Sequence, residues 1–145
     1  MSESFLQQAM VPVANRENAA ALAAALAPRV DAVGGTVIVV HVIKKAGGEL
    51  DKASVEQREL AAEGIFDIVS DGLDDTDASI ETEILYGTNV AETIIDAAHD
   101  TSANAIVFAP RPGSRWKKLL SGDVTHELLG STDIPVLVHR PSPHR

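Results

Sequence analysis

The sequence predicts an α/β fold: one open, parallel, Rossmann-like sheet of five strands with helices on both faces. Short apolar runs alternate along the chain with longer segments of helical periodicity. The run TVIVVHVI at residues 36–43 is rich in β-branched residues, which is typical of a strand buried on both faces. The 145 residues suffice for one domain, with a core at about 10–140, and are too few for two.

Strands are expected where apolar residues run without helical spacing. Their ranges are 9–13, 36–43, 79–85, 104–109 and 134–139. The segment SIETEIL at 79–85 alternates apolar and polar residues, as an edge strand with one solvent-facing side would. Pro135 stands near the start of the last strand, where a missing N–H is tolerated. Pro12 is a local conflict, because it lies in a strand that should be central.

Four helices are expected between these strands. Their ranges are 15–33, 50–69, 89–99 and 116–128. The first is Ala-rich, with Leu22 and Leu26 four residues apart, and the glycine pair at 34–35 ends it. Three residues are expected on the buried stripe of the second helix: Leu60, Phe66 and Val69.

The third helix has a start signal in the sequence. Asn89, followed three residues later by Glu92, resembles a capping box in which Asn replaces the usual Ser or Thr. Residues 71–77 form an acidic segment before the third strand. We interpret it as a solvated turn rather than a calcium site, because it lacks the ligand spacing of an EF-hand loop.

The charge balance and the composition limit the partners and the cellular site. Lys+Arg 12 against Asp+Glu 21 gives a net charge of -9, which argues against nucleic-acid binding. No apolar run approaches the ~20 residues that span a bilayer, and the N-terminus shows no export signal. We therefore expect a cytoplasmic protein without membrane insertion. The 21 Ala, 11 Asp and only 5 Lys suggest adaptation to high salt, against the plainer alternative of an acidic cytosolic protein.

One basic stretch stands out in this acidic chain. The sequence RPGSRWKK at 111–118 contains no acid and leads into an expected helix. Its four basic residues are Arg111, Arg115, Lys117 and Lys118. Basic side chains with free backbone N–H groups make an anion site, but a basic turn that balances nearby carboxylates, or a self-association face, explains them equally well.

Candidate catalytic and metal-binding groups are sparse. The chain has no cysteine, so thiolate sites and disulfides are excluded. His41 lies within a strand, where we expect it to be a hydrogen-bonded core residue, and the other histidines are dispersed without metal-site spacing. No serine lies in a GxSxG context. We expect a protein that is not an enzyme and holds no metal.

Three segments carry a family resemblance. MVPVAN opens the chain's core, VVHVI ends the second strand, and the last third reads NAIVFAPRPGSRWKKLLSGDVTHELLGSTDIPVLVHR. Together they resemble the universal stress protein family from about residue 10 to 140. The resemblance implies strand order 3-2-1-4-5, a role in stress resistance without a defined catalytic activity, and in many members ATP or AMP between strands one and four. It also implies a homodimer through the last strand, at Val136, Leu137 and Val138.

The nucleotide-binding branch of that family carries a motif from which this chain departs. That branch has an adenine-contacting Asp after the first strand, where this chain has Ala14. It also has Gly-x-x-Gly, nine residues, then Gly followed by Ser or Thr. Ala109 and Pro112 stand at the first two of these glycines, Gly122 matches the third, and Asp123 replaces the hydroxyl residue.

Each departure weakens the implied site. Ala14 cannot accept a hydrogen bond from adenine, and the methyl group of Ala109 blocks close approach of the backbone. Pro112 removes an N–H donor. Asp123 would place a negative charge beside the phosphates, at a cost of ~1 to 4 kcal/mol for charges ~4 Å apart. A one-residue shift would let Gly113 replace Pro112, but the interval to the third glycine then shortens to eight.

We therefore predict a dimeric, non-catalytic stress-response or regulatory module that binds ATP weakly or not at all and needs no cofactor, with a regulatory partner that the sequence does not identify. The alternative is an adenine-nucleotide switch with a remodelled ATP or AMP site. Its contacts would come from the backbone of Val42 and, around the phosphates, from Gly113, Ser114, Gly122 and Val124.

Overall fold

The computed structural model describes residues 7–33, 35–44, 52–108 and 133–138. In these residues, one all-parallel, five-stranded sheet has the order β3-β2-β1-β4-β5. The strands are β1 (Gln8–Pro12), β2 (Thr36–Lys44), β3 (Ser79–Gly87), β4 (Ala105–Phe108) and β5 (Val136–Val138), and the helices are α1 (Arg16–Val33), α2 (Lys52–Gly72) and α3 (Val90–Asp100). The predicted α/β fold class and the implied strand order are confirmed. The helix expected at 116–128 lies outside the described residues.

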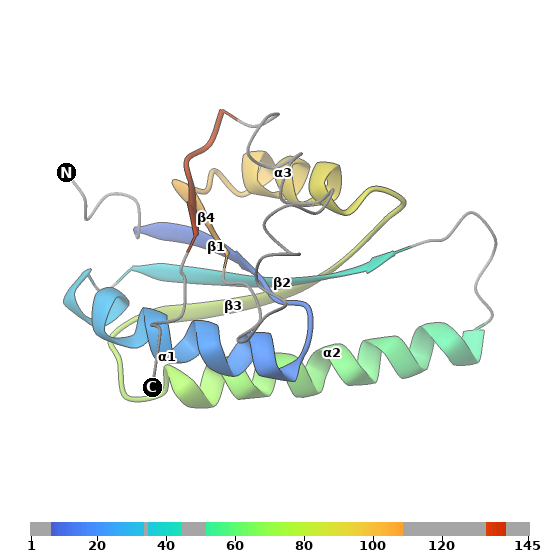
Figure 1. Cartoon of the computed structure of the whole chain (residues 1–145), viewed down its shortest axis with the longest axis horizontal. Helices are drawn as coiled ribbons and strands as arrows, with labels where there is room; N and C mark the ends of the chain where they lie inside the picture. The colour runs from blue at the N-terminus through green and yellow to red at the C-terminus, as the bar shows by residue number, and fades with distance from the viewer. Residues whose placement is uncertain (1–6, 34, 45–51, 109–132, 139–145) are drawn as a thin grey trace, which may run out of the picture.

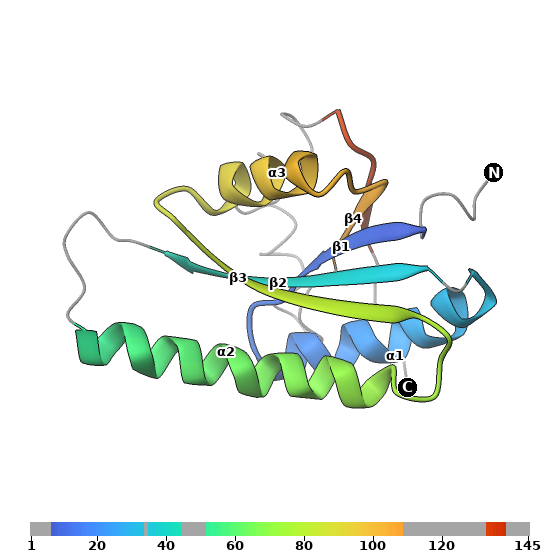
Figure 2. The same ribbon diagram turned by 180° about the vertical axis from the view of Figure 1, so that it is seen from behind.

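The helices divide between the two faces of the sheet. Helices α1 and α2 lie on one face and α3 lies on the other (Figure 1, Figure 2). Right-handed crossovers produce this arrangement, because the chain moves outward from β1 to β3 and then returns across the sheet to β4. The direction of winding reverses between β1 and β4, so the carboxyl end of β1 is the topological switch point.

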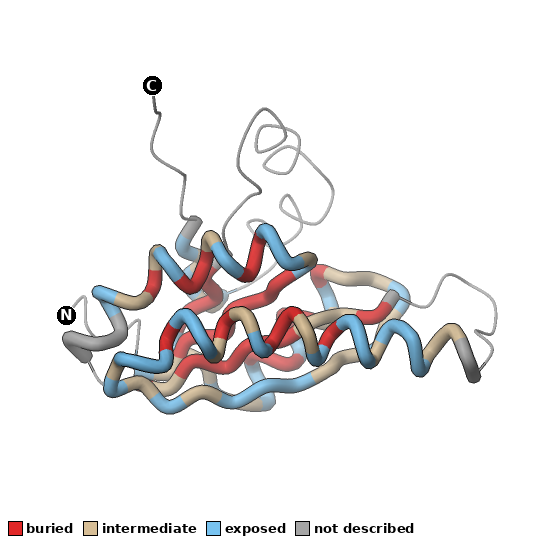
Figure 3. The backbone as a smooth tube through the Cα atoms, turned by 90° about the horizontal axis from the view of Figure 1, so that it is seen from below, coloured by how far each residue is buried: buried red, intermediate tan, exposed pale blue. Residues whose placement is uncertain are grey.

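Side-chain alternation along the strands builds two apolar layers. One layer packs strand residues such as Val11 and Val39 against α1 and α2, while Met10 and Val40 pack against α3 on the other side. Figure 3 shows buried residues along the central strands and at intervals along the helices. None of the helices in the described segments is long and apolar enough to cross a membrane.

The buried stripe of α2 differs from the prediction at one residue. Phe66 and Val69 are buried, but the side chain of Leu60 is 72% exposed. The stripe passes through Ala62, which is two residues from Leu60 and therefore ~200° away around the helix. The helix also continues to Gly72, so the expected acidic turn loses its first two residues to the helix.

Pro12 is accommodated because it closes β1. Val13 N–H donates to the Val40 carbonyl on the β2 side at 2.9 Å. Since N–H groups alternate sides along a strand, the N–H that Pro12 lacks would point toward β4. The last β1–β4 pair is Met10↔Ile106, so the missing donor falls beyond that ladder.

The start of α3 matches its sequence signal. Asn89 is the N-cap, and its Oδ1 accepts from Glu92 N–H at 2.9 Å. Just before it, a Cβ on Gly87 would overlap the Thr93 side chain at Oγ1. Only glycine therefore allows this close approach between the end of β3 and α3.

The end of α3 uses a residue that the sequence did not indicate. Ser102 has a positive φ of 57°, in the left-handed region. Its N–H donates to the His99 carbonyl at 3.1 Å, and Ala103 N–H donates to the Ala98 carbonyl at 2.9 Å. This pair of bonds is a Schellman motif with serine where glycine is usual.

The outer strand β3 is an edge strand, as its alternating sequence predicted. It pairs with β2 over nine residues, from Thr36↔Ser79 to Lys44↔Gly87. Its middle residues Glu81, Thr82 and Glu83 are exposed.

Candidate functional site

At the switch point, β1 ends several residues before its neighbour β2. The β1–β2 register stops at Pro12↔Val40, while β2 continues beside β3 to Lys44. The end of β2 therefore extends beyond β1. We call residues 13–15 and 18, together with residues 41–43, the switch-point edge. Ligands of open α/β sheets bind at such a position.

Val42 presents main-chain groups at this edge. In a strand, the N–H and C=O of one residue point to the same side, and successive residues alternate. The Val40 carbonyl faces β1, because it accepts from Val13 N–H at 2.9 Å. The N–H and C=O of Val42 therefore face the same side, past the last β1–β2 pair. A neighbouring donor and acceptor in this position can recognise the edge of a planar heterocycle.

Ala14 is exposed at the start of the connection to α1, and its main chain is already engaged. Its N–H donates to Asn18 Oδ1 at 3.0 Å. Asn18 N–H in turn donates to Asn15 Oδ1 at 2.8 Å. The bond to Asn15 caps the start of α1, and the bond from Ala14 lets the buried Asn18 hold the backbone of the loop in place. Sequence reasoning missed both asparagines, although their three-residue spacing after a strand was a signal.

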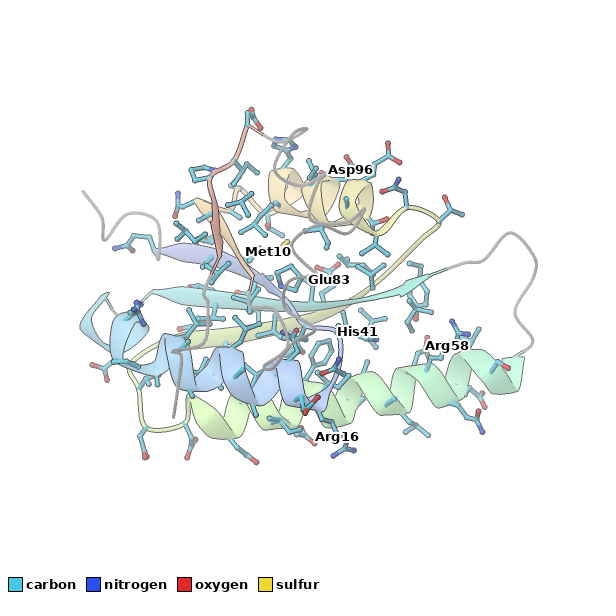
Figure 4. The ribbon with its side chains drawn as sticks, viewed as in Figure 1. Met10, Arg16, His41, Arg58, Glu83 and Asp96 are labelled. Carbon is cyan, nitrogen blue, oxygen red and sulfur yellow. The ribbon has the colours of Figure 1, made fainter. Side chains whose placement is uncertain are left out.

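The side chain of His41 links β2 to the residue that follows β1, on one face of the sheet. It shares its face with Val37 and Val39, and Figure 4 shows it on the side of the sheet that faces α1. Its Nδ1 lies 2.8 Å from the Val13 carbonyl oxygen. A carbonyl oxygen only accepts, so Nδ1 carries the proton. The expected hydrogen bond is confirmed, although the residue is half-buried rather than a core residue.

Most of the predicted site residues lie outside the described residues. The structure places Ala14 directly after Val13 and Val42 directly after His41, whose side chain contacts the Val13 carbonyl. The other predicted site residues are Ala109, Arg111, Pro112, Gly113, Ser114, Gly122, Asp123 and Val124, and all of them lie outside the described residues, as does the basic stretch 111–118.

Two polar pairs elsewhere shift the pKa of one member. The Tyr86 hydroxyl donates to Glu59, and this bond, with some burial and the negative charge, raises the pKa of Tyr86. His99 Nε2 lies 2.8 Å from Asp133 Oδ1, and this contact lowers the pKa of Asp133. The pairs join β3 to α2 and α3 to the segment before β5. Among the described residues, no group of three or more His, Cys, Asp or Glu side chains could hold a metal ion.

Together, the sheet and its switch-point edge define an open α/β domain, and ligands of such domains bind at the position that the end of β1 occupies here. Comparison with known proteins identifies the family. The model of the universal stress protein family matches residues 6–140, and the chain belongs to this family.

Individual relatives agree with this assignment. Over 66 residues, 46% of this chain, the sequence is 41% identical to the stress response protein NhaX of Bacillus subtilis, and the match spans 39% of that relative's length. The universal stress protein of Archaeoglobus fulgidus has a similar structure, with a TM-score of 0.70 at 22% identity, covering 91% of this chain and 97% of that one. Its complex with dAMP has a TM-score of 0.66 at 21% identity, covering 91% and 96%.

Proposed function

We propose that this chain is a non-catalytic, dimeric stress-response or regulatory module of the cytoplasm that binds an adenine nucleotide only weakly. Membership of the universal stress protein family supports the stress-response role. One observation carries the weak binding: Ala14 offers no side-chain acceptor, and its N–H is bonded to Asn18.

The energetics of adenine recognition explain why this one position matters. Val42 offers a main-chain donor and acceptor toward the end of β1, which suits the hydrogen-bonding edge of a purine. The nucleotide-binding branch adds an Asp at the position of Ala14. A hydrogen bond to a charged group contributes ~1.5–3 kcal/mol, so its loss weakens affinity by roughly tenfold to a hundredfold.

A gain-of-function variant tests this proposal. Ala14→Asp should tighten the binding of AMP and ATP by roughly tenfold or more, because it returns a carboxylate to the switch-point edge. Isothermal titration of the purified protein measures the change. Ala20→Asp is the matched control, since Ala20 is an exposed residue of α1 and the variant adds the same charge away from the edge. Equal affinities in the two variants would refute the role of position 14.

The second candidate function is an adenine-nucleotide switch with a remodelled site. The dAMP complex of the Archaeoglobus fulgidus relative and the orientation of Val42 favour it. Mass spectrometry of freshly purified, denatured protein separates the two functions. One adenine nucleotide released per chain would favour the switch, while nucleotide-free protein that still binds at high concentration would favour the weak module.

The proposed dimer forms through β5. This strand lies at the edge of the sheet, beside β4, and the side chain of Leu137 is 37% exposed. An edge strand with an exposed apolar residue favours pairing with a second copy. Sedimentation velocity on the whole chain tests this dimer, and a monomer at micromolar concentration would argue against it.

A further inference from the structure

The β1–β2 ladder ends with an exchange of donors at Val13. The Val13 N–H makes the regular ladder bond to the Val40 carbonyl at 2.9 Å. In a continued parallel ladder, the Val13 carbonyl would next accept from Val42 N–H. In this structure the carbonyl accepts from the side chain of His41, whose Nδ1 lies 2.8 Å away.

We propose that His41 is a positioning residue that ends this ladder and keeps the Val42 N–H available to a ligand. By engaging the Val13 carbonyl, the imidazole takes the place of the next main-chain donor. Val42 can then offer its N–H and C=O together to a ligand with a neighbouring acceptor and donor, such as the N1 and N6 edge of adenine. This inference rests on the proposed function for the identity of its ligand. The replacement of the Val42 N–H by the His41 side chain as donor to the Val13 carbonyl can be tested without any ligand.

The geometry around His41 suits this role. Its ring approaches Val13 from the α1 face, because it shares the side of the sheet with Val39. The His41 side chain therefore reaches the Val13 carbonyl from the α1 face of the sheet. It does not occupy the position beside the main-chain N–H and C=O of Val42. On its other edge, β2 remains paired with β3 through Val42↔Leu85, so the strand that carries these groups is held in place.

The two sides of β1 end by different means at neighbouring residues. On the β4 side, the ladder stops at Met10↔Ile106, and Pro12 supplies no further donor. On the β2 side, the imidazole of His41 occupies the next carbonyl, that of Val13. The β1–β4 and β1–β2 ladders therefore stop within a few residues of the switch point. Beyond these residues, the end of β1 makes no further main-chain ladder bonds to the described residues of either neighbouring strand.

A purely structural role for His41, as a filler between β2 and α1, makes different predictions. The side chain of Asn places its amide nitrogen the same two bonds from Cβ as Nδ1 of His. Asn can therefore donate to the Val13 carbonyl, whereas Gln places its nitrogen one bond further out. Leu retains apolar volume without any donor. Three variants thus distinguish the effect of the side-chain donor from the effect of side-chain volume: His41→Asn, His41→Gln and His41→Leu.

Amide hydrogen exchange in the nucleotide-free protein tests the donor exchange directly. In His41→Leu and His41→Gln, we expect the Val13 carbonyl to accept from Val42 N–H, which should slow exchange of the Val42 amide by at least tenfold. His41→Asn should retain the wild-type rate. The Ile43 amide faces β3 and serves as the internal reference, whose rate should stay constant. An unchanged exchange rate of the Val42 amide in His41→Leu, which has no side-chain donor, would overturn the proposal.

Thermal unfolding shows whether each variant is folded. If His41→Leu does not fold, His41→Phe is the second donor-free variant, with the same expected slowing at Val42. AMP titration then adds the ligand: the affinity for AMP should fall about fivefold in His41→Leu and His41→Phe and be retained in His41→Asn. Slower Val42 exchange combined with no AMP binding by the wild-type chain would support the positioning role of His41 and refute the proposed ligand.

Discussion

Replacement of Ser102 by glycine should stabilise the protein. Ser102 holds a φ of 57° at the end of α3, where it completes the two Schellman bonds to the His99 and Ala98 carbonyls through its own N–H and that of Ala103. A residue with a Cβ in the left-handed region costs ~1–2 kcal/mol, because Cβ approaches the following carbonyl oxygen. Its side chain is exposed, so little packing is lost with it.

The expected gain in the free energy of unfolding is smaller than the cost of the left-handed conformation at Ser102. Glycine has more freedom in the unfolded chain, which returns ~0.5–1 kcal/mol. We therefore expect Ser102→Gly to raise the free energy of unfolding by ~0.5–1 kcal/mol, or Tm by about 1–4 °C for a domain of this size. Calorimetry and denaturant unfolding measure both quantities.

The matched control keeps the strain. Ser102→Ala retains a Cβ in the left-handed region and should give no such gain. Asp100→Gly, in the last turn of α3, should destabilise the protein by about 0.5–1 kcal/mol. A Tm for Ser102→Gly at or below that of the wild type would refute the reasoning.

Three further predictions concern helix packing, assembly and pH. Gly72→Ala should lower Tm by several degrees, because its Cβ would lie 2.5 Å from the Cβ of Ala23 on α1. Leu137→Lys should shift the sedimentation coefficient toward the monomer, since it places a charge on the exposed edge strand. Asp133→Asn should lower Tm near pH 5, because His99 lowers the pKa of Asp133 and the ionised form stabilises the fold above the unfolded pKa of about 3.9. That difference should vanish as the pH falls through the lowered folded pKa.

Each of these predictions has its own control. Gly64→Ala should be neutral or stabilising, because its new methyl group meets only the flexible end of Arg16. Thr82→Lys adds the same charge to the opposite edge of the sheet and should leave self-association unchanged. A loss of stability in Asp133→Asn that persists unchanged at pH 2 would show that the contact does not depend on ionisation.

Local sequence signals were sufficient to locate the described strands and helices along the chain, whereas the order of the strands in the sheet was implied by the family resemblance. The β-branched run of β2, the alternation of β3 and the Asn89 cap all appear where their patterns predicted them. Leu60 was misplaced because apolar residues surround much of α2, and only packing against the sheet selects which stripe is buried. The left-handed Ser102 carries no compositional signal, because serine rarely adopts that conformation.

The candidate site was predictable only in part. The position of Val42 followed from the resemblance, but the orientation of its main-chain groups depends on where β1 stops, which the β1–β2 register reveals. The role of His41 depends on a contact with Val13, 28 residues away in the sequence. No local pattern reports such a contact. Asn18 is different, since its spacing from Asn15 is a local signal for a helix cap.

An open sheet has two edge strands, and a protein that paired with further copies of itself through both edge strands could polymerise. On the β3 margin, Glu81 and Glu83 face solvent from the middle of the strand. Two copies aligned there would bring their carboxylates together in a confined space, where like charges repel. We therefore expect two copies not to pair through β3, so that the proposed dimer through β5 does not extend by β3–β3 pairing.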